Sequence, residues 1–301
     1  MSAPKITVVI PTHARPAQLE ACLDGIARLD CAPDGFEVVI ADDGGPESLE
    51  PLIAEWRDRL ALRLTVRARG GPASARNAGA EVARGRFLAF IDDDCVPASG
   101  WLSAMLRELE QRPDSLLGGP TMNGLPDNPY ATASHRIAIY VQRYYHGSGG
   151  NERFFTGNNL AVSAERFRDV GGFDTSIPSA TAEDKEFCDR WRSRNYEMAW
   201  VPDAEVIHAH DLTLVSFLRQ HYNYGRGIFA FRLIRRRRGK SRLVPEPFSF
   251  YWNLILFPLR DREGGRTWRD VTLMIAAQLA TVAGAFWAAM FGRPKDPDAR
   301  P

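Results

Sequence analysis

Short apolar runs alternate with amphipathic stretches along the first part of this chain, and most of the runs end in polar or acidic residues. Apolar and β-branched residues in a row predict four strands, at residues 6–10, 36–41, 62–67 and 86–91. Apolar residues at helical spacing predict helices between them, at 16–29, 49–60 and 73–83. This alternation, with polar residues at the strand exits, indicates an α/β fold with a doubly wound, mostly parallel sheet.

The pattern is less regular after a predicted helix at 101–111. We expect the further strands at 117–120, 154–162 and 200–206, and the further helices at 133–144 and 182–194. From Leu214 onward the residues become aromatic, basic and apolar. We therefore expect a globular domain at 1–213 and a separate helical region at 214–301.

Charge is divided unevenly between these two parts, although the formal net charge of the 301 residues is only +1. Residues 214–301 carry 16 Lys and Arg against 6 Asp and Glu, about +10, and the preceding part carries 22 against 31, about −9. The basic region should prefer anionic surfaces. Four cysteines without CxxC or metal-ligand spacing favour a reduced, cytoplasmic compartment. Residues 1–10 lead into a strand, so we expect no signal peptide.

Three adjacent carboxylates, Asp92, Asp93 and Asp94, follow the apolar run at 87–91. The run is typical of a strand buried on both faces, and ligands of open α/β sheets bind beyond the carboxyl ends of the strands. Adjacent carboxylates repel one another unless a cation or a donor-rich ligand neutralises them. A hard divalent ion that holds a nucleoside diphosphate would do so. The alternative is an acidic turn that caps the next helix.

Other candidate groups lie at comparable positions. Asp42 and Asp43 end the second predicted strand, where they can accept hydrogen bonds from a nucleobase or ribose, or form an Asp-Asp-Gly-Gly turn. Gly70 and Gly71 open a helix whose free N–H groups and dipole favour an anion. Arg76, in the same helix, supplies a planar cation suited to phosphate.

Glu183 and Asp184 lie at the start of the helix predicted at 182–194. Negative charge is favoured at this end of a helix, so capping explains both residues. As a functional group, one of them would be a general base that removes the proton of a bound hydroxyl. Phe187 and Trp191 are one helical turn apart and should face the core.

Six segments in this order resemble the family 2 glycosyltransferases of GT-A fold: Val9-Ile10-Pro11-Thr12, Asp42-Asp43-Gly44, Arg76-Asn77-Ala78-Gly79, Asp92-Asp93-Asp94, Gly157-Asn158-Asn159 and Glu183-Asp184. The resemblance covers residues 5–210 and implies a nucleotide-sugar-binding half at 1–115 and an acceptor-binding half at 116–213. It implies an inverting enzyme of bacterial cell-envelope type that uses Mg²⁺ or Mn²⁺ and a UDP-, GDP- or dTDP-sugar. The implied acceptor is a hydroxyl of a glycan or of a lipid-linked envelope precursor, and we expect no nucleic acid partner.

The resemblance also implies individual roles on the nucleotide side. Asp42 and Asp43 match the acidic pair that binds the base, and Arg76 matches a position that contacts the nucleotide. The remaining implied nucleotide contacts are Pro11, Thr12, Arg15, Asp92 and Asp93.

By the same resemblance, Asp92 and Asp94 match the DxD motif, with Asp94 as the direct metal ligand and Asp92 nearer the sugar or ribose. Asp184 matches the catalytic base, and Glu183 its partner. A metal ion would neutralise charge on the leaving nucleoside diphosphate, and a base on the opposite side of the sugar would take the proton of the acceptor. His208 follows a predicted strand where the family often has a histidine that reaches the metal or the diphosphate, although a lone histidine is more often structural.

Four residues are candidates for contact with the acceptor. Asn158 and Asn159 either orient the acceptor or satisfy a turn. Trp101 resembles an aromatic residue near the sugar site, and its other interpretation is a core residue. Arg226 either binds an acceptor phosphate or pairs with a carboxylate.

The C-terminal region combines apolar and basic segments. Residues 271–292 carry no formal charge and are long enough for a membrane-spanning helix, but they are rich in alanine. Residues 248–257 are aromatic and apolar, and an arginine cluster at 235–238 lies upstream. We expect peripheral attachment to an anionic membrane surface at the inner face of the cell membrane. A single spanning helix, a buried C-terminal helix and a solvated basic face are the alternatives.

Two other classes of protein share part of this pattern. A nucleotidyltransferase also has strand-end acids and a metal, but it would need a glycine-rich loop after the first strand, where residues 11–16 contain no glycine. A non-catalytic protein that binds nucleotide sugars or glycans would not need the third acidic group at 183–184. The QxxRW signature of processive members is absent, which favours the addition of one sugar.

Overall fold

The computed structural model of the chain describes residues 4–32, 35–145, 154–177, 181–239, 246–260 and 268–291. They form two compact units. Unit 1 consists of Met1–Gly124, His146–Thr175 and Asp184–Ala209, and unit 2 consists of Leu125–Tyr145, Ser176–Glu183 and His210–Pro301. Two segments that precede residue 214 thus group with the C-terminal helices, and the domain boundary expected there stays a prediction.

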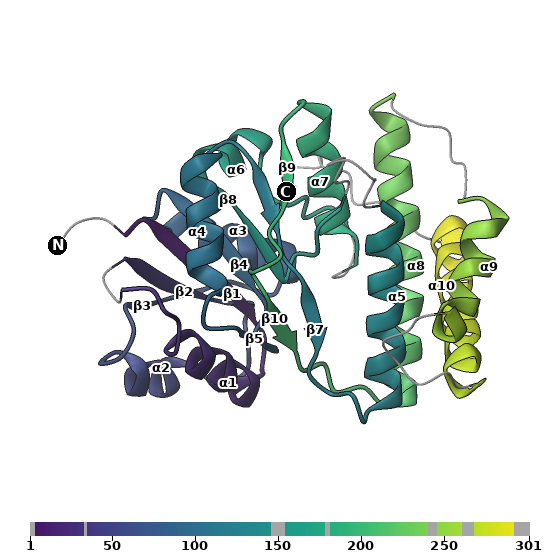
Figure 1. The fold of residues 1–301 in the computed structure, drawn as a ribbon, viewed down its shortest axis with the longest axis horizontal. Coiled ribbons are helices and arrows are strands. Elements are labelled where there is room, and N and C mark those ends of the chain that lie inside the picture. Colours follow the sequence, from purple (N-terminus) through teal and green to yellow (C-terminus); the bar gives the residue numbers. More distant parts are fainter. Residues whose placement is uncertain are drawn as a thin grey trace. The chain divides into compact units, whose positions relative to one another are not determined.

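Unit 1 contains a large sheet with the strand order β3-β2-β1-β4-β8-β6-β9 (Figure 1). Its strands are β1 (Ile6–Thr12), β2 (Phe36–Asp42), β3 (Leu62–Val66), β4 (Phe87–Ile91), β6 (Leu116–Gly118), β8 (Asn159–Ser163) and β9 (Met198–Trp200). β1 pairs in parallel with β2 and β4, and β2 pairs in parallel with β3. β8 runs antiparallel to both of its neighbours. The sheet is therefore mostly parallel, as the sequence pattern predicts.

Helices cover both faces of this sheet. They are α1 (Pro16–Ile26), α2 (Glu50–Trp56), α3 (Pro72–Val82), α4 (Trp101–Gln111), α6 (Ala164–Val170) and α7 (Glu183–Ser193), whose first residue belongs to unit 2. Val8 and Ile10 of β1 join the hydrophobic cluster formed with α1, α2 and α4, whereas Val9 joins the cluster formed with α3, α6 and α7. Because side chains alternate along a strand, β1 is buried on both faces, and the doubly wound prediction is confirmed.

A second, three-stranded sheet in unit 1 was not expected from the sequence. It has the order β5-β10-β7 and consists of β5 (Cys95–Pro97), β10 (Val206–His208) and β7 (Thr121–Asn123). β10 pairs antiparallel with β5, so that His208 lies opposite Cys95. This short sheet therefore brings the residue after the acidic triplet next to the candidate histidine.

The continuous strand predicted at 200–206 is wrong. β9 ends at Trp200 and β10 begins at Val206, and a turn separates them. Pro202 explains the break, because it has no N–H for a sheet hydrogen bond, and Asp203 beside it favours a turn. The strand expected at 154–162 is likewise shorter and begins only at Asn159.

Unit 2 is helical in the part that the structure describes. Its long helices are α5 (Pro129–Tyr145), α8 (Leu214–Arg237), α9 (Phe248–Arg260) and α10 (Trp268–Phe291), and they enclose their own hydrophobic cluster. α10 covers the uncharged segment expected to be helical, except for Gly292, which lies outside the described residues. A buried ion pair joins Arg136 of α5 to Asp270 in the first turn of α10.

α8 and α10 pack closely over much of their lengths because each has a glycine at the crossing. A Cβ atom on Gly225 of α8 would lie 1.9 Å from the carbonyl oxygen of Thr281, and one on Gly284 of α10 would lie 1.9 Å from that of Tyr222. Any larger side chain at either position would collide with the main chain of the other helix.

Candidate active site

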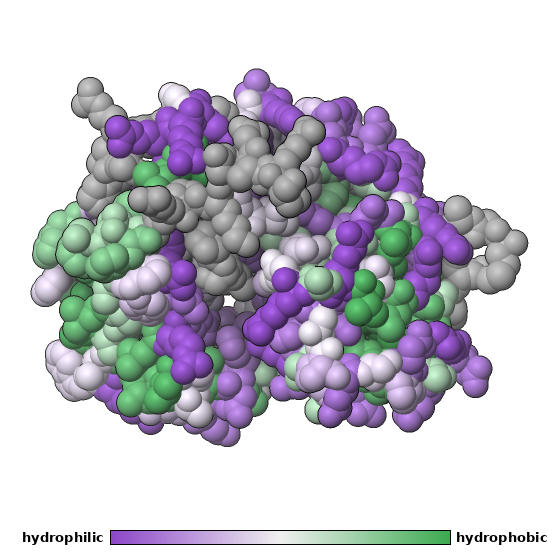
Figure 2. All heavy atoms as spheres, turned by 180° about the vertical axis from the view of Figure 1, so that it is seen from behind, coloured by the Kyte–Doolittle hydropathy of each residue, from purple (hydrophilic) through white to green (hydrophobic). Residues whose placement is uncertain are grey.

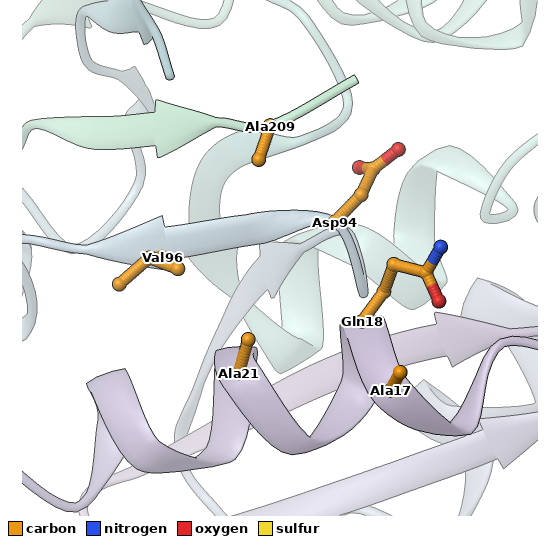
Figure 3. A pocket seen from close by; sticks show the side chains of 6 residues that line it. All are labelled: Ala17, Gln18, Ala21, Asp94, Val96 and Ala209. Carbon is orange, nitrogen blue, oxygen red and sulfur yellow. The ribbon is translucent and has the colours of Figure 1, made fainter. Parts of the chain in front are cut away.

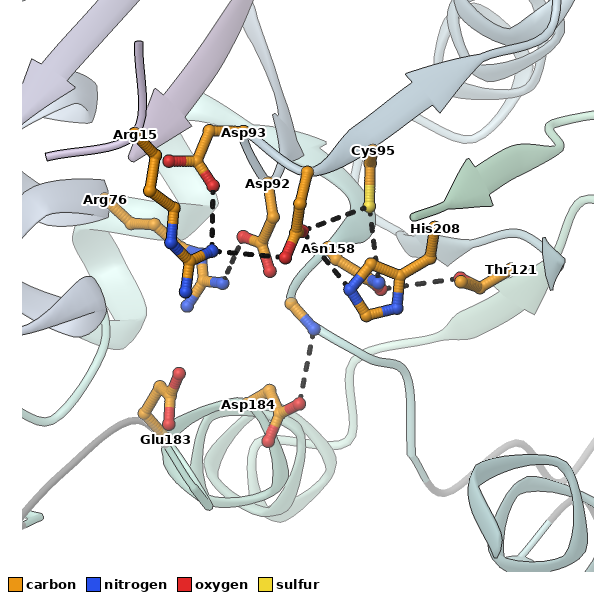
Figure 4. Close-up of polar contacts among 12 residues, drawn as sticks. Arg15, Arg76, Asp92, Asp93, Cys95, Thr121, Asn158, Glu183, Asp184 and His208 are labelled. Atoms are coloured by element: carbon orange, nitrogen blue, oxygen red, sulfur yellow. Dashed lines mark hydrogen bonds and ion pairs between the residues drawn. The ribbon is translucent and has the colours of Figure 1, made fainter. Parts of the chain in front are cut away.

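The three carboxylates that follow β4 have three different sets of partners (Figure 4). Asp92 accepts a hydrogen bond of 2.6 Å from Nη2 of Arg76. Arg76 itself is only 4% exposed and lies in the second turn of α3, with its guanidinium 5.6 Å from the ring centre of Phe173. The pair therefore joins the end of β4 to the helix that begins after Gly70 and Gly71.

Asp93 points into the protein. Its carboxylate accepts hydrogen bonds from Oγ1 of Thr12, at 2.7 Å, and from Nη1 of Arg15, at 3.3 Å. Burial raises the pKa of Asp93 to about 6, against the opposing effects of Thr12 and Arg15. The side chain of Asp93 is 5% exposed, and its hydrogen bonds hold the β1 exit and Arg15 in place. Pro11 is also buried, within β1.

Asp94 belongs to a group of three potential metal ligands with Cys95 and His208. Oδ1 of Asp94 lies 3.2 Å from Nε2 of His208 and 4.0 Å from Sγ of Cys95. The ligand atoms of all three lie within 4.8 Å of one another. Burial lowers the pKa of His208, but the hydrogen bond that its imidazole donates to Asp94 and the charges of Asp94 and Asp92 outweigh burial and raise that pKa. Burial, followed by the same two carboxylates, raises the pKa of the Cys95 thiol.

The candidate ligand Asp94 and the candidate histidine are thus adjacent, whereas Asp92 is engaged with Arg76. Arg15 makes a further ion pair with Asp94, at 3.2 Å, and its side chain is about half exposed. Cys95 was missed because it has no cysteine partner in the sequence. The usable signal was its place directly after the acidic triplet.

The acidic pair at the exit of β2 is buried and supports the surrounding loops. Oδ1 of Asp43 accepts from the N–H of Gly70 at 2.7 Å, and Oδ2 accepts from the N–H of Gly71 at 2.9 Å. Asp42 accepts from the N–H of Gly45 at 3.0 Å. Asp43 therefore fixes the glycine loop that begins α3, a structural task that sequence reasoning did not assign to it.

Three residues of the segment Arg76-Asn77-Ala78-Gly79 have identifiable tasks. The side chain of Asn77 accepts from the N–H of Phe173 and donates to its carbonyl, each at 2.8 Å. A Cβ atom on Gly79 would lie 2.4 Å from Cγ1 of Val9, so glycine lets α3 approach β1 closely. Arg76 faces the site, and the two other residues position the helix that carries it.

Asp184, near the start of α7, lies on the same side of unit 1 as the acidic triplet. Its Oδ2 accepts from the N–H of Gly157 at 3.3 Å, and its Oδ1 accepts from the N–H of Lys185 at 2.7 Å. A Cβ atom on Gly157 would meet the guanidinium of Arg76 at 3.1 Å. Asp184 is therefore separated from the Arg76–Asp92 pair by one backbone segment, and Figure 4 shows the three side chains in the same neighbourhood.

Glu183 and Arg226 belong to unit 2 and have their contacts there. Glu183 is buried and its Oε2 accepts from the N–H of Ala182 at 3.1 Å. The guanidinium of Arg226 lies 4.7 Å from the ring centre of Trp287 on α10, and its Nη1 donates to Oδ1 of Asn223. Their roles toward Asp184 and the acceptor stay predictions.

Two predicted acceptor contacts are corrected by their burial. Trp101 and Asn159 are both 0% exposed, and Nε1 of Trp101 donates to Oδ1 of Asn159 at 2.9 Å. The amide nitrogen of Asn159 donates to the carbonyls of Pro120 and Ala204. These two residues hold the core together and do not face an acceptor. Asn158 is buried as well, with its amide nitrogen 3.7 Å from Sγ of Cys95.

A shallow hollow of about 210 Å³ lies beside the acidic triplet, between α1 and β5 (Figure 3). It is lined by Ala17, Gln18, Ala21, Asp94, Val96 and Ala209. The volume is below the range of roughly 300–1,000 Å³ that is usual for small-molecule pockets. The lining is mainly apolar, so this hollow is an unsuitable place for a nucleotide diphosphate.

A doubly wound sheet with one reversed strand, covered by helices on both faces, is the arrangement of the GT-A fold. The mannosyltransferase PcManGT from Pyrobaculum calidifontis, solved with GDP-Man and Mn²⁺, is similar over 97% of this chain and 77% of that one, with a TM-score of 0.61 at 21% sequence identity. At this identity the likeness shows the fold alone.

The sequence model of glycosyl transferase family 2 matches residues 7–171, and the chain belongs to this family. The glycosyltransferase AglE of Haloferax volcanii is 24% identical over 228 residues, which are 74% of this chain and 73% of AglE. The validoxylamine A glucosyltransferase of Streptomyces hygroscopicus subsp. limoneus is 36% identical over 105 residues, which are 34% of this chain but only 23% of that enzyme. The expectation of a family 2 glycosyltransferase is confirmed. Asp184 and His208 lie beyond the matched residues.

Proposed function

We propose that the protein transfers a sugar from a nucleotide-sugar donor to a hydroxyl acceptor with inversion at the anomeric carbon, and that a divalent metal is required. The observation that carries this proposal is the grouping of Asp184, Arg76 and Asp92 around the backbone segment at Gly157. A prospective base and a phosphate-binding arginine then border one region, as a direct displacement of the nucleotide requires.

The side chains at the end of β4 fit Mn²⁺ or Mg²⁺. Asp94 offers carboxylate oxygens and His208 an imidazole nitrogen, with Oδ1 and Nε2 already 3.2 Å apart. Oxygen ligands suit both ions and imidazole suits Mn²⁺, so this pair would hold the metal and leave positions for diphosphate oxygens. When bound, such an ion stabilises negative charge on the departing diphosphate. PcManGT, of the same fold, was solved with Mn²⁺.

The donor would lie along the exits of β1, β2 and β4. Arg76 and the half-exposed Arg15 are cations suited to phosphate. The eleven-residue helix α3 directs free N–H groups toward the same edge of the sheet. Asp42 is the proposed contact for the base, and Asp43 beside it holds the glycine loop with both of its oxygens. The donor would be a UDP-, GDP- or dTDP-sugar.

Asp184 would act as the general base. The N–H groups of Gly157 and Lys185 each bind one of its two oxygens, so the carboxylate is held in a fixed orientation. From there it would take the proton of the acceptor hydroxyl as the oxygen attacks the anomeric carbon. The nucleoside diphosphate departs on the opposite side, which inverts the configuration.

The test compares two variants with a matched control. Asp184→Asn should lower transfer by about 10²–10⁴-fold, the usual contribution of general base catalysis, while calorimetry shows nearly unchanged donor binding. Asp94→Ala should abolish the Mn²⁺-dependent part of donor binding. Asp203→Asn removes a carboxylate that is 77% exposed and should match the wild type in both assays. Equal losses of binding and transfer in Asp184→Asn would exclude the base.

We also propose that unit 2 attaches the enzyme to the cytoplasmic face of a membrane, where it adds single sugars to a glycan or a lipid-linked envelope precursor. Among the described residues, only α10 is long and apolar enough to cross a bilayer. Large apolar side chains at three- and four-residue spacing are exposed along it: Leu279, Val282, Phe286 and Met290. Figure 2 shows hydrophobic surface over the C-terminal helices, on its left.

The packing of α10 favours attachment in the plane of the membrane over crossing it. α10 is held against α8 by the Gly225–Gly284 crossing, so a bilayer around α10 would also surround much of α8. α8 carries Arg219, Arg226 and Arg232 along its length, and arginine at the centre of a bilayer is costly. Exposed arginines at the end of α8, Arg236 and Arg237, suit anionic headgroups instead. Each would add about 1 kcal/mol of binding free energy to an anionic membrane surface.

A further inference from the structure

We propose that Asp94, Cys95 and His208 form a three-ligand site for a thiophilic divalent cation, with Zn²⁺ as the ion of choice. Zn²⁺ bound there would compete with the Mg²⁺ or Mn²⁺ of the proposed transfer reaction. The inference shares two ligands with that proposal, but it rests on the three side chains and not on any donor or acceptor.

The register of the small sheet creates the site. Cys95 of β5 lies opposite His208 of β10 in an antiparallel pair, so their side chains leave the sheet on the same face. Asp94 directly precedes Cys95, and its backbone carbonyl accepts from the N–H of Ala209. Hydrogen bonds on both sides of the ladder therefore fix the main chain of all three residues.

The distances suit tetrahedral coordination. With Zn–N and Zn–O distances near 2.0–2.1 Å and Zn–S near 2.3 Å, neighbouring ligand atoms of a tetrahedral site lie roughly 3.3–3.8 Å apart. In the structure, Oδ1 of Asp94 is 3.2 Å from Nε2 of His208 and 4.0 Å from Sγ of Cys95, and no pair exceeds 4.8 Å. Small side-chain rotations are enough to bring the three atoms to bonding distance from one ion.

The donor set selects the ion. A thiolate sulfur is a poor ligand for Mg²⁺, but carboxylate, imidazole and thiolate groups are all established ligands of Zn²⁺. Affinity for a mixed site of this kind rises from Mn²⁺ to Zn²⁺. Binding replaces the S–H bond of Cys95 by an S–Zn bond and releases the proton to solvent. Three protein ligands leave the fourth position for water or a diphosphate oxygen.

A second layer of contacts supports the sulfur. The amide nitrogen of Asn158 lies 3.7 Å from Sγ of Cys95 and donates to it, and Oδ1 of the same amide accepts from Oγ1 of Thr121. An N–H donor of this kind stabilises the charge of a metal-bound thiolate and orients its lone pairs. The structure thus gives the buried Asn158 a place beside a metal ligand, where sequence reasoning expected an acceptor contact.

The experiment uses the full chain stripped of metal. Titration with Cd²⁺ should produce the ultraviolet charge-transfer band of a Cd–thiolate bond at one ion per chain, and calorimetry should show tight binding of Zn²⁺. Cys95→Ser should remove the band and weaken Zn²⁺ binding by more than about 100-fold. Even mutation of a group that only hydrogen-bonds to a metal ligand lowers metal affinity by about 10–100-fold. Cys188→Ser, a change at another buried cysteine of unit 1, should keep both.

His208→Gln provides a second variant that leaves Cys95 intact, and it should also weaken Zn²⁺ binding. A band that persists in Cys95→Ser, its absence in the wild type, or unchanged Zn²⁺ affinity in His208→Gln would each overturn the inference. Failure of Zn²⁺ binding with intact Mn²⁺-dependent donor binding would leave the transfer proposal standing. Zn²⁺ binding without affinity for any nucleotide sugar would support the zinc site and contradict the transfer proposal.

Discussion

Aspartates at the edge of the large sheet perform different tasks although their chemistry is the same. Asp43 and Asp93 are buried and bind groups of the protein, namely the glycine loop before α3 and the side chains of Thr12 and Arg15. Asp94 and Asp184 are the carboxylates that we propose as the metal ligand and the general base. The buried aspartates act indirectly, because they hold the arginine and the loop that a donor would contact.

Loss of the Asp43 carboxylate should therefore reduce stability. Hydrogen bonds to a charged group contribute about 1.5–3 kcal/mol, so Asp43→Ala should lower the free energy of unfolding in urea by about that amount. Asp43→Asn, which keeps one acceptor, should cost less. The control is Asp203→Ala, at a side chain that is 77% exposed. An Asp43→Ala protein as stable as this control would contradict the assigned role.

The sequence located the candidate residues at strand ends, but it did not show which way each side chain points. Trp101 and Asn159 are examples, because their side chains point into the core and form a hydrogen bond with each other there. That contact joins residues far apart in the chain, and no local pattern encodes it. The same holds for Cys95, whose relevance depends on the cross-strand position of His208.

At the scale of elements, long buried strands and amphipathic helices could be predicted, and α4 was predicted with its observed bounds. The three-residue strands β5 and β7 could not, since so short a segment carries no periodicity. Their strand state comes from pairing with β10. The antiparallel direction of β8 could not be predicted from the sequence either, because the direction of a strand depends on the path by which the chain returns to the sheet.

The crossing of α8 and α10 gives a prediction for these elements. Gly284→Ala places a methyl group 1.9 Å from the carbonyl oxygen of Tyr222, which cannot move without the main chain of α8. Overpacking of this kind costs about 1–3 kcal/mol, enough to outweigh the better helix propensity of alanine. Limited proteolysis should therefore cut unit 2 faster.

Ala283→Leu adds a larger side chain at the neighbouring, exposed position and should leave the cleavage rate unchanged. Equal rates for Gly284→Ala and the wild type would show that the two helices do not approach as closely as described.

At the scale of the whole molecule, the chain combines an acidic part, residues 1–213, with a basic part, residues 214–301. The family match at residues 7–171 contains the acidic triplet but not α8, α9 or α10. Charge asymmetry was visible in the sequence because it needs only counting. The grouping of α5 with the C-terminal helices was not visible, since it depends on packing in the hydrophobic core of unit 2, around Phe217, Phe250 and Met274.

Membrane attachment should be measurable by flotation of the full chain with lipid vesicles. We expect binding to vesicles with anionic lipids, weaker binding to neutral ones, and release by high salt because screening weakens attraction between charges. A spanning helix would resist salt, so retention at high salt would contradict attachment in the plane.

Two matched substitutions locate the contact. Val282 on α10 and Val66 on β3 are 62% and 60% exposed, so a change to glutamate costs each a similar amount of apolar surface. Val282→Glu should reduce flotation, and Val66→Glu should not. Equal loss in both variants would indicate a general effect of charge.

The three-residue ladder that brings His208 opposite Cys95 also has a consequence for synthesis. A nascent chain leaves the ribosome from its N-terminus, so β1 to β4 and the aspartates that follow them emerge long before β10. For that interval the growing polypeptide carries the carboxylates without the imidazole. A chain terminated before residue 206 could form the first parallel strands, but it would have no histidine at the cation site.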